Sequence, residues 1–242
     1  MILEKEMKLS DVILHDYSLV PVIARFGIQL GFGDATIESV CRNENVDIDF
    51  LLTILNVFHD PDVLDQNHLQ EFPIELLIDY LKKAHQYYLH NKIPEIEYLI
   101  DEMVEEAEGN LEPFLLLQKF FSDYTSELKK HIDREENVVY PYVMELNSSV
   151  SAANVSESVI SMIKDYSITL YEEEHDNVEE KLTDLKNIII KYLPPEKSQK
   201  NRFRLLKELS VLEKDLADHS RIEDMILVPK VELLEKKVLK DR

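Results

Sequence analysis

The sequence predicts an all-α fold, in which a bundle of four long helices follows a small helical N-terminal domain. Three observations support this class. Apolar residues recur at helical spacing over long segments after residue 74, only four glycines occur in 242 residues, and no segment alternates like a strand. Long amphipathic helices with short connections pack as an antiparallel bundle. We therefore expect the small domain at residues 1–66 and the bundle at residues 67–242.

The small domain is predicted from a glycine-rich loop and the segment after it. Three glycines lie close together in FGIQLGFG, namely Gly27, Gly31 and Gly33. Their spacing indicates a turn or loop. Residues 34–58 are expected to form two short helices, the first capped by Asp34 or Thr36 and the second by Asp47. Residues 61–73 carry prolines at both ends and little apolar periodicity, so we interpret them as a linker.

The first two long helices are expected between Ile74 and residue 146. The first has a buried stripe at helical spacing, made of Leu77, Tyr80, Leu81, Ala84 and Tyr88. Pro94 is expected to kink or break it before Gly109, and Pro113 lies early in the second helix, where a first-turn proline is tolerated. The serine-rich segment 147–158 is interpreted as a loop.

The third and fourth helices are expected on either side of a pair of prolines. Residues 159–193 are predicted to form one helix that stops at Pro194. Residues 199–239 are predicted to form the fourth, with a kink at Pro229.

Composition restricts the classes of partner and the compartment. A net charge of −21 argues against a surface that tracks phosphates, so neither nucleic acid nor an anionic membrane is expected as a partner. The single cysteine, Cys41, excludes a disulfide framework within the chain and fits a reducing cytoplasm. The sequence shows no secretory signal and no apolar segment long enough to span a membrane. We therefore expect a cytoplasmic protein.

Two His-x-x-x-Glu pairs are the most informative motif in the chain. His131 and Glu135 form one pair, and His219 and Glu223 form the other. Four residues make about one helical turn, so each pair places an imidazole and a carboxylate on one face. Such ligands suit iron, zinc or manganese, and two pairs on facing helices can hold a two-metal centre.

Further histidines extend this pattern to all four predicted bundle helices. The other two helices carry His85 and His175 at positions compatible with the interior, and His175 forms a third pair with Glu179. Spacing alone therefore leaves Glu179 as a ligand candidate. Four imidazoles and two bridging carboxylates can hold two iron ions and leave positions open for water or a diatomic ligand. A buried His–Glu network without metal is the structural alternative.

The remaining histidines and the tyrosines carry weaker signals. His90 follows His85 by five residues, about 140° around the helix, so it should face elsewhere. Three histidines outside the bundle are interpreted as surface or packing residues, namely His15, His59 and His68. Six tyrosines either line a pocket near the metal or fill the core, namely Tyr87, Tyr88, Tyr140, Tyr142, Tyr166 and Tyr171.

Residues 74–242 resemble a hemerythrin-like domain of the RIC type, the "repair of iron centres" proteins, also called regulators of cell morphogenesis and NO signalling. The matching stretches are HQYYLHNKIPEI, HIDREENVVYPYV, HDNVEEKLTDL and HSRIEDMILVPKVELLE. The resemblance implies a non-haem di-iron centre with oxo and carboxylate bridges. It carries the ligand pattern over onto His85, His131, Glu135, His175, His219 and Glu223. According to the resemblance, Glu179 is not a metal ligand, although it can contact the ligands.

The N-terminal part resembles the ScdA-like domain that precedes the bundle in this family. The family loop typically reads Ile-Asp-Phe-Cys-Cys-Gly-Gly, whereas residues 28–33 read Ile-Gln-Leu-Gly-Phe-Gly. Both cysteines are absent. Cys41, on the following predicted helix, is interpreted as a packing residue and not as their replacement. The resemblance therefore carries over no function that needs paired thiols.

The resemblance implies a stress-response protein that repairs iron–sulfur clusters, or supplies iron to them, after nitrosative or oxidative damage. Iron–sulfur proteins would then be partners, and NO or O2 would be ligands. The alternative is a sensor or reversible carrier of O2 or NO without turnover, and a third is a scaffold without functional metal. The residues leave open iron against manganese or zinc, enzymatic activity and homodimerisation through the N-terminal helices. They predict no catalytic residue.

Overall fold

The computed structural model describes residues 2–60, 72–107, 109–152, 156–165, 167–169, 178–194 and 199–240. The regular elements in these ranges are helices, and an isolated backbone bridge joins Lys8 to Thr36. The predicted all-α class is therefore confirmed. The predicted domain boundary at 66/67 and most of the predicted linker lie outside these ranges.

The N-terminal part contains four short helices, which are α1 (Leu9–His15), α2 (Leu19–Arg25), α3 (Ile37–Glu44) and α4 (Ile48–His59). The last two are the predicted pair. Thr36 caps α3 by accepting the Ser39 N–H at 3.2 Å, and Asp47 caps α4 by accepting the Phe50 N–H at 2.8 Å. The glycine-rich segment is a loop as predicted, because its three glycines all have positive φ. The sequence analysis did not identify α1 and α2.

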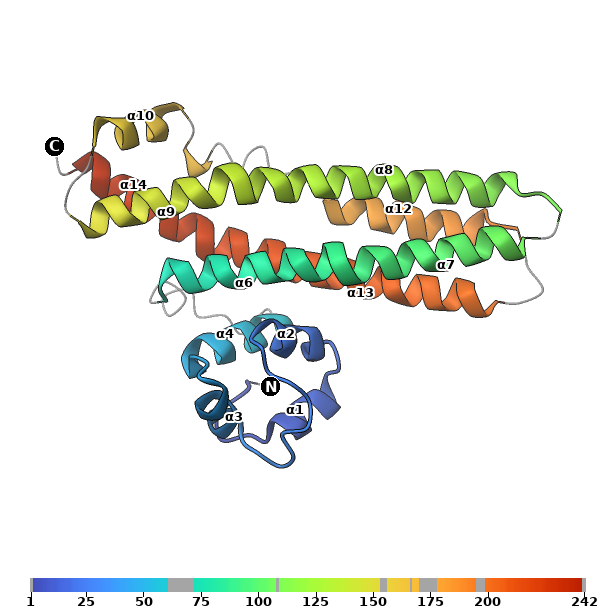
Figure 1. The fold of residues 1–242 in the computed structure, drawn as a ribbon, viewed down its shortest axis with the longest axis horizontal. Coiled ribbons are helices and arrows are strands. Elements are labelled where there is room, and N and C mark those ends of the chain that lie inside the picture. Colours follow the sequence, from blue (N-terminus) through green and yellow to red (C-terminus); the bar gives the residue numbers. More distant parts are fainter. Residues whose placement is uncertain are drawn as a thin grey trace.

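The bundle is built from long rods, each a run of successive helical elements (Figure 1). In the part of the chain that the structure describes, three of these rods contain a π-helical turn. Their elements are α6 (Ile74–Tyr87), η2 (Tyr88–Lys92), α7 (Ile93–Glu106), α8 (Glu112–Arg134), η3 (Glu135–Val139), α9 (Tyr140–Ser151), α12 (Val178–Lys191), α13 (Lys200–Ile222), η4 (Glu223–Leu227) and α14 (Val228–Lys240). At one end, α7 and α12 each lie beside both α8 and α13. At the other end, α9 packs against α6 and α14. The predicted helical bundle is therefore confirmed.

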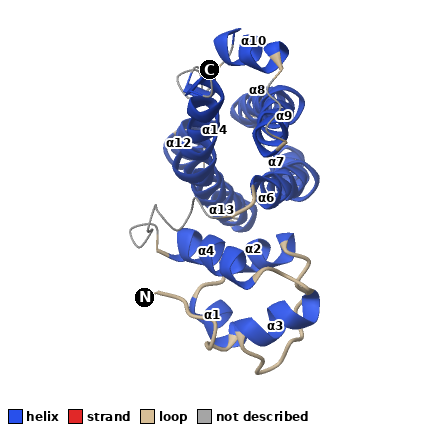
Figure 2. Ribbon diagram, turned by 90° about the vertical axis from the view of Figure 1, so that its left-hand side faces the viewer, coloured by secondary structure: helices blue, strands red, loops and turns tan. Residues whose placement is uncertain are grey.

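The N-terminal helices pack against two of these rods. α2 contacts α6, and α4 contacts α13. Seen along the bundle, α2 and α4 form the layer next to it, and α1 and α3 lie on the far side (Figure 2). One apolar cluster joins both parts, because it contains Leu51 and Ile54 of α4 together with Leu77 and Leu81 of α6. Burial of apolar surface therefore holds the two parts together.

Two predicted helix boundaries near the middle of the chain were wrong. α9 continues to Ser151, so the predicted loop 147–158 begins as helix, because Val150 packs against the apolar core. The predicted helix 159–193 is interrupted, since α10 (Glu157–Asp165) ends and Ser167 is not helical. The N–H of Ile168 donates to the buried Glu235 carboxylate at 2.8 Å instead of to a helical carbonyl. α10 then packs on α9 and α14.

A second apolar cluster fills the other half of the bundle, with Leu99, Leu117, Leu185 and Leu209 among its members. The two clusters meet along three rods. On the rod of α8 and α9 and on that of α13 and α14, a polar group separates them, namely Glu135 and His219. On α6, the buried His85 directly follows Ala84, where the second cluster begins. A polar layer therefore crosses the interior of the bundle.

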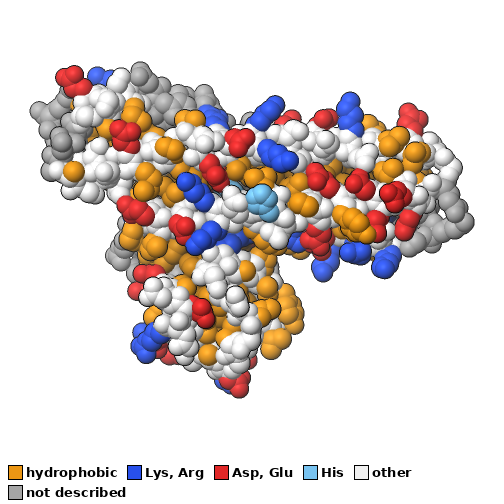
Figure 3. All heavy atoms as spheres, in the orientation of Figure 1, with side chains coloured by type: hydrophobic (Ala, Val, Ile, Leu, Met, Phe, Trp, Pro, Cys, Tyr) orange, Lys and Arg blue, Asp and Glu red, His pale blue; other side chains and the backbone are white. Residues whose placement is uncertain are grey.

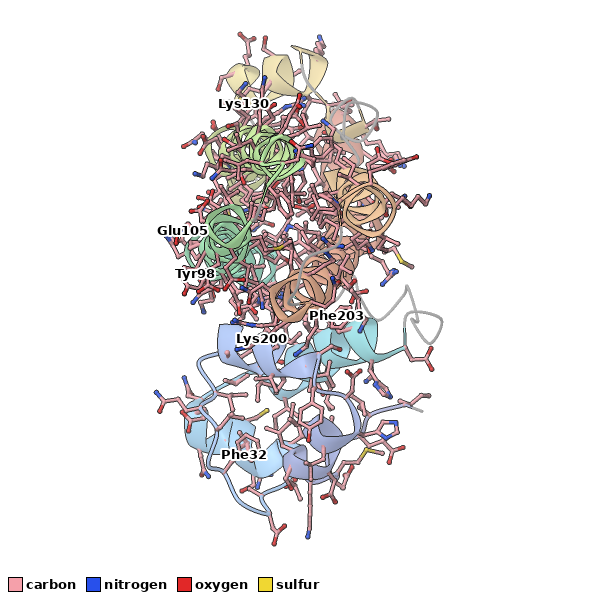
Figure 4. The ribbon with its side chains drawn as sticks, turned by 90° about the vertical axis from the view of Figure 1, so that its right-hand side faces the viewer. Phe32, Tyr98, Glu105, Lys130, Lys200 and Phe203 are labelled. Atoms are coloured by element: carbon pink, nitrogen blue, oxygen red, sulfur yellow. The ribbon has the colours of Figure 1, made fainter. Side chains whose placement is uncertain are left out.

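One face of the bundle carries a mixture of charged side chains. Acidic and basic side chains are interspersed along the face of the bundle shown in Figure 3. Tyr98, Glu105 and Lys130 lie on the outer side of the bundle, whereas other side chains fill the space between its helices (Figure 4). None of the described helices has the length and hydropathy needed to cross a membrane.

Cys41 lies in the apolar core of the N-terminal part and is 0% exposed. Burial, together with the charge of Asp47, raises the pKa of its thiol to about 11. The prediction that Cys41 is a packing residue is confirmed. We expect a colorimetric disulfide reagent at pH 8 to label the native protein far more slowly than the protein in denaturant. Equally fast labelling in both states would contradict this expectation.

Candidate metal centre

Four side chains from three rods meet in the polar layer. They are His85 of α6, Glu135 at the start of η3, His219 of α13 and Glu223 at the start of η4, and their ligand atoms lie within 4.8 Å of one another. All four are buried. The Nε2 atom of His85 lies 3.2 Å from Nε2 of His219 and 3.2 Å from Oε2 of Glu135. Nε2 of His219 lies 3.5 Å from Oε1 of Glu223.

His131 joins this group through Glu135. Its Nε2 atom lies 3.1 Å from Oε1 of Glu135, and its side chain is 16% exposed, more than those of the four buried groups. The predicted ligand His175 lies outside the described residues, and so does the side chain of Glu179. The structure therefore brings together five of the six predicted ligands.

The other histidines lie away from the cluster where the structure describes them. His90 is exposed on η2, as predicted from its helical angle. Nδ1 of His59 lies 3.0 Å from Oδ2 of Asp16, and the rings of His15 and His59 are in edge contact at 5.7 Å. His15 and His59 therefore belong to the packing of the N-terminal part, and His68 lies outside the described residues.

Three π-helical turns lie at or close to predicted ligand positions, and each of them ends two residues before a proline. In each turn the residue before Pro94, Pro141 or Pro229 donates its N–H to the carbonyl five residues back, which is that of Tyr88, Glu135 or Glu223. Proline has no N–H, and its ring clashes with the carbonyl four residues earlier. That carbonyl falls inside the widened turn, so the helix continues. Of the kink or break predicted at Pro94, the break does not occur, because the helical backbone continues from α6 through η2 into α7. Such π-helical turns often occur at functional sites.

The extra residue in η3 changes which side chains face the interior. In an α-helix, residues five apart point about 140° away from each other. Across η3, however, Glu135 and Tyr140 are each 1% exposed and both face the polar layer. The Tyr140 hydroxyl donates to Oε1 of Glu223 at 2.9 Å, and its ring stacks on that of His85 at 5.9 Å.

Glu136 is a further contact of the cluster that the sequence analysis missed. Its Oε1 atom lies 3.0 Å from Nδ1 of His85, on the side of the ring opposite to Nε2. A carboxylate at this position fixes the tautomer and orientation of a metal-binding imidazole. The only sequence signal was its place directly after Glu135. Among the predicted tyrosines, Tyr88 also lies at the cluster, with its ring in edge contact with His219 at 5.8 Å.

The electrostatics of the cluster differ between its two buried imidazoles. Burial lowers the pKa of His219 to about 3, and the nearby His85 adds to this effect. Burial also lowers the pKa of His85, but the hydrogen bond to Glu135 and the charges of Glu135 and Glu223 outweigh it, so this pKa is raised. At neutral pH His219 is therefore a neutral imidazole with a lone pair to donate.

The donor set fits a divalent metal ion. Two carboxylates and two imidazoles lie between apolar clusters, where buried charges cost free energy unless they are paired or bind a metal. Nδ1 of His219 is buried and has no hydrogen-bond partner in the described ranges. The hydrogen-bonding capacity of this imidazole is therefore not fully satisfied by the protein around it. Mixed nitrogen and oxygen donors of this kind suit iron, manganese or zinc.

Comparison with known proteins agrees with this geometry. The model of the hemerythrin HHE cation binding domain matches residues 76–231. An iron-sulfur cluster repair protein ScdA from Staphylococcus haemolyticus is 20% identical over 213 residues, covering 86% of this chain and 90% of that protein. An iron-sulfur cluster repair protein ScdA from Staphylococcus epidermidis is 20% identical over 230 residues, covering 94% of this chain and 98% of that protein.

Proposed function

Because the chain belongs to the hemerythrin HHE cation binding family, we propose that it is a non-haem di-iron protein that repairs iron–sulfur clusters or supplies iron to them. It would act on clusters that nitrosative or oxidative stress has damaged. The observation that carries the proposal is the buried cluster of His85, Glu135, His219 and Glu223. The names of the staphylococcal relatives support the repair role.

The contacts of the Glu135 carboxylate with two histidines support a role for it in holding the metal. Its two oxygens lie 3.2 Å from Nε2 of His85 and 3.1 Å from Nε2 of His131, which come from different rods. Glu223 lies beside His219 in the same cluster. The two glutamates would hold the metal through their carboxylate oxygens and the histidines through their imidazole nitrogens, and His175 would complete the set. Bound iron would supply Lewis-acid and one-electron chemistry at this site.

The protein's own residues orient and shield the site. Glu136 holds the His85 ring through Nδ1, and Tyr140 holds Glu223 through its hydroxyl. The apolar clusters on both sides limit access of water. His131 has the most exposed side chain among the ligands that the structure describes, so we assign iron exchange with a client protein to its side of the cluster.

A sensor or reversible carrier of O2 or NO is the second candidate. The absence of the paired cysteines and the burial of Cys41 favour it, since the chain offers no pair of thiols near residues 28–33 to assist repair. The two candidates share the metal centre and differ in whether iron leaves it.

Iron analysis and a transfer assay distinguish these functions. We expect about two irons per chain after growth in iron-replete medium. Iron-loaded protein should then restore the activity of a [4Fe–4S] dehydratase damaged by NO, whereas the Glu135→Ala variant should not. Reversible NO-dependent spectral changes without restored activity would favour the carrier. Absence of metal in protein that is folded and purified without chelator would refute both.

A further inference from the structure

Arg25, the last residue of α2, is buried against the bundle although it belongs to the N-terminal part. Its side chain is 2% exposed. The sequence analysis assigned it no role. Its partners lie on α6 and α13, the two helices that carry His85 and His219.

Arg25 pairs with a carboxylate of α13 that lies one helical turn before a predicted ligand. Its Nη2 atom lies 2.5 Å from Oδ2 of Asp215, whose side chain is 9% exposed. Asp215 precedes His219 by four residues, so the two side chains lie on the same face of the helix.

On the other rod, Arg25 contacts aromatic residues on both sides of His85. Its Nη1 donates to the Tyr80 hydroxyl at 3.2 Å. Its guanidinium carbon also lies 5.1 Å from the ring centroid of Tyr87 and 5.4 Å from that of Tyr88. A guanidinium at these distances is attracted to the ring faces. One side chain of the N-terminal part therefore contacts the two rods that carry His85 and His219.

Tyr88 completes a continuous path from Arg25 to His219. Its hydroxyl donates to Oδ1 of Asp215 at 3.0 Å and to the Asp215 carbonyl at 3.2 Å. Its ring meets the edge of the His219 ring at 5.8 Å with an interplanar angle of 75°. Movement of Asp215 would therefore displace the aromatic ring that supports His219.

Space beside the ion pair allows such a movement. Asp215 and Lys214 line a cavity of about 500 Å³ between the N-terminal part and α13, to which Ser18 and Phe58 also contribute. A buried carboxylate that loses its cationic partner carries a large desolvation cost. Without Arg25, the Asp215 carboxylate gains solvation by turning toward this cavity and away from Tyr88.

We propose that Arg25 is a positioning residue for the metal centre. By clamping Asp215 and Tyr80 from outside the bundle, it fixes the spacing of His85 and His219 and makes retention of the metal depend on docking of the N-terminal part. This inference rests on the proposed metal centre and adds to it a function for the N-terminal part that does not use cysteine.

The test is the rate of iron loss to a chelator from iron-loaded full-length protein. We expect Arg25→Met and Asp215→Asn each to release iron at least about tenfold faster than the natural chain. Replacement of a residue that orients a metal ligand typically weakens metal binding by about this factor or more. Arg25→Lys should partly restore retention, and the visible spectrum of the iron protein should shift in Arg25→Met. The double variant should release iron no faster than the faster single variant, because both substitutions break the same pair.

Lys214→Ala is the matched control. Lys214 is adjacent to Asp215 and also crosses to the N-terminal part, donating to the Ser18 hydroxyl at 2.9 Å and to the Phe58 carbonyl at 3.3 Å. It lies outside the Arg25–Asp215–Tyr88 path, so its loss should leave iron release within about twofold of the natural rate, as exposed polar contacts contribute little. Equal acceleration in Lys214→Ala and Arg25→Met would show general loosening of the interface and overturn the proposal.

Tyr88→Phe covers the case in which Arg25→Met fails to fold. It removes the hydroxyl that binds Asp215 and keeps the ring beside His219. Faster iron release is expected here too. Folded Tyr88→Phe and Asp215→Asn proteins that both hold iron like the natural chain would overturn the proposal. Failure of the natural chain to bind iron would instead refute the metal centre itself.

Discussion

Replacement of Glu135 by alanine is expected to lower bound iron from about two ions per chain to less than one. Glu135 contacts both His85 and His131, so its loss removes a side chain that joins these two imidazoles. Elemental analysis of purified protein measures the result. Helical circular dichroism should stay near that of the natural chain, because the apolar clusters on both sides of the site supply most of the packing.

His90→Ala is the matched control for Glu135→Ala. His90 lies on η2, close in sequence to His85, but its side chain is exposed. Its replacement should leave the iron content unchanged, and His59→Ala in the N-terminal part should do the same. His131→Ala should also lower iron below two per chain. A full iron complement in Glu135→Ala, or a marked loss in His90→Ala, would show that the site is wrongly assigned.

Replacement of Glu136 by glutamine is expected to weaken metal binding about 10- to 100-fold while leaving the ligands in place. The carboxylate of Glu136 accepts from Nδ1 of His85, which holds the ring with Nε2 toward the cluster. Its side chain is 27% exposed, so the substitution should cost the fold little. Competition with a chelator of known affinity measures the change.

Asp133→Asn provides the comparison for charge alone. Asp133 lies three residues before Glu136 and is exposed, so its replacement removes one nearby negative charge without touching His85. Metal affinity should then stay close to that of the natural chain. Equal weakening in the two variants would indicate a long-range charge effect instead of orientation of the imidazole.

The sequence by itself determined the features that depend on local periodicity. The buried stripe of the first long helix, including Leu77 and Leu81, follows from a helical period of 3.6 residues. The Thr36 and Asp47 caps depend on atoms three residues apart. The His-x-x-x-Glu pairs, such as His131 with Glu135, were found in the same way, because a four-residue separation fixes a common face before any tertiary contact exists.

Features that depend on several elements were decided only by the tertiary structure. The Arg25–Asp215 pair joins residues 190 positions apart, and the His85–Glu136 contact joins residues 51 positions apart. Neither leaves a periodic trace in the sequence. The interruption after α10 also involves a distant residue, since the backbone N–H of Ile168 donates to the Glu235 carboxylate, 67 positions later. Periodicity reports which face of a helix is apolar, but which side chains meet there depends on how the helices pack.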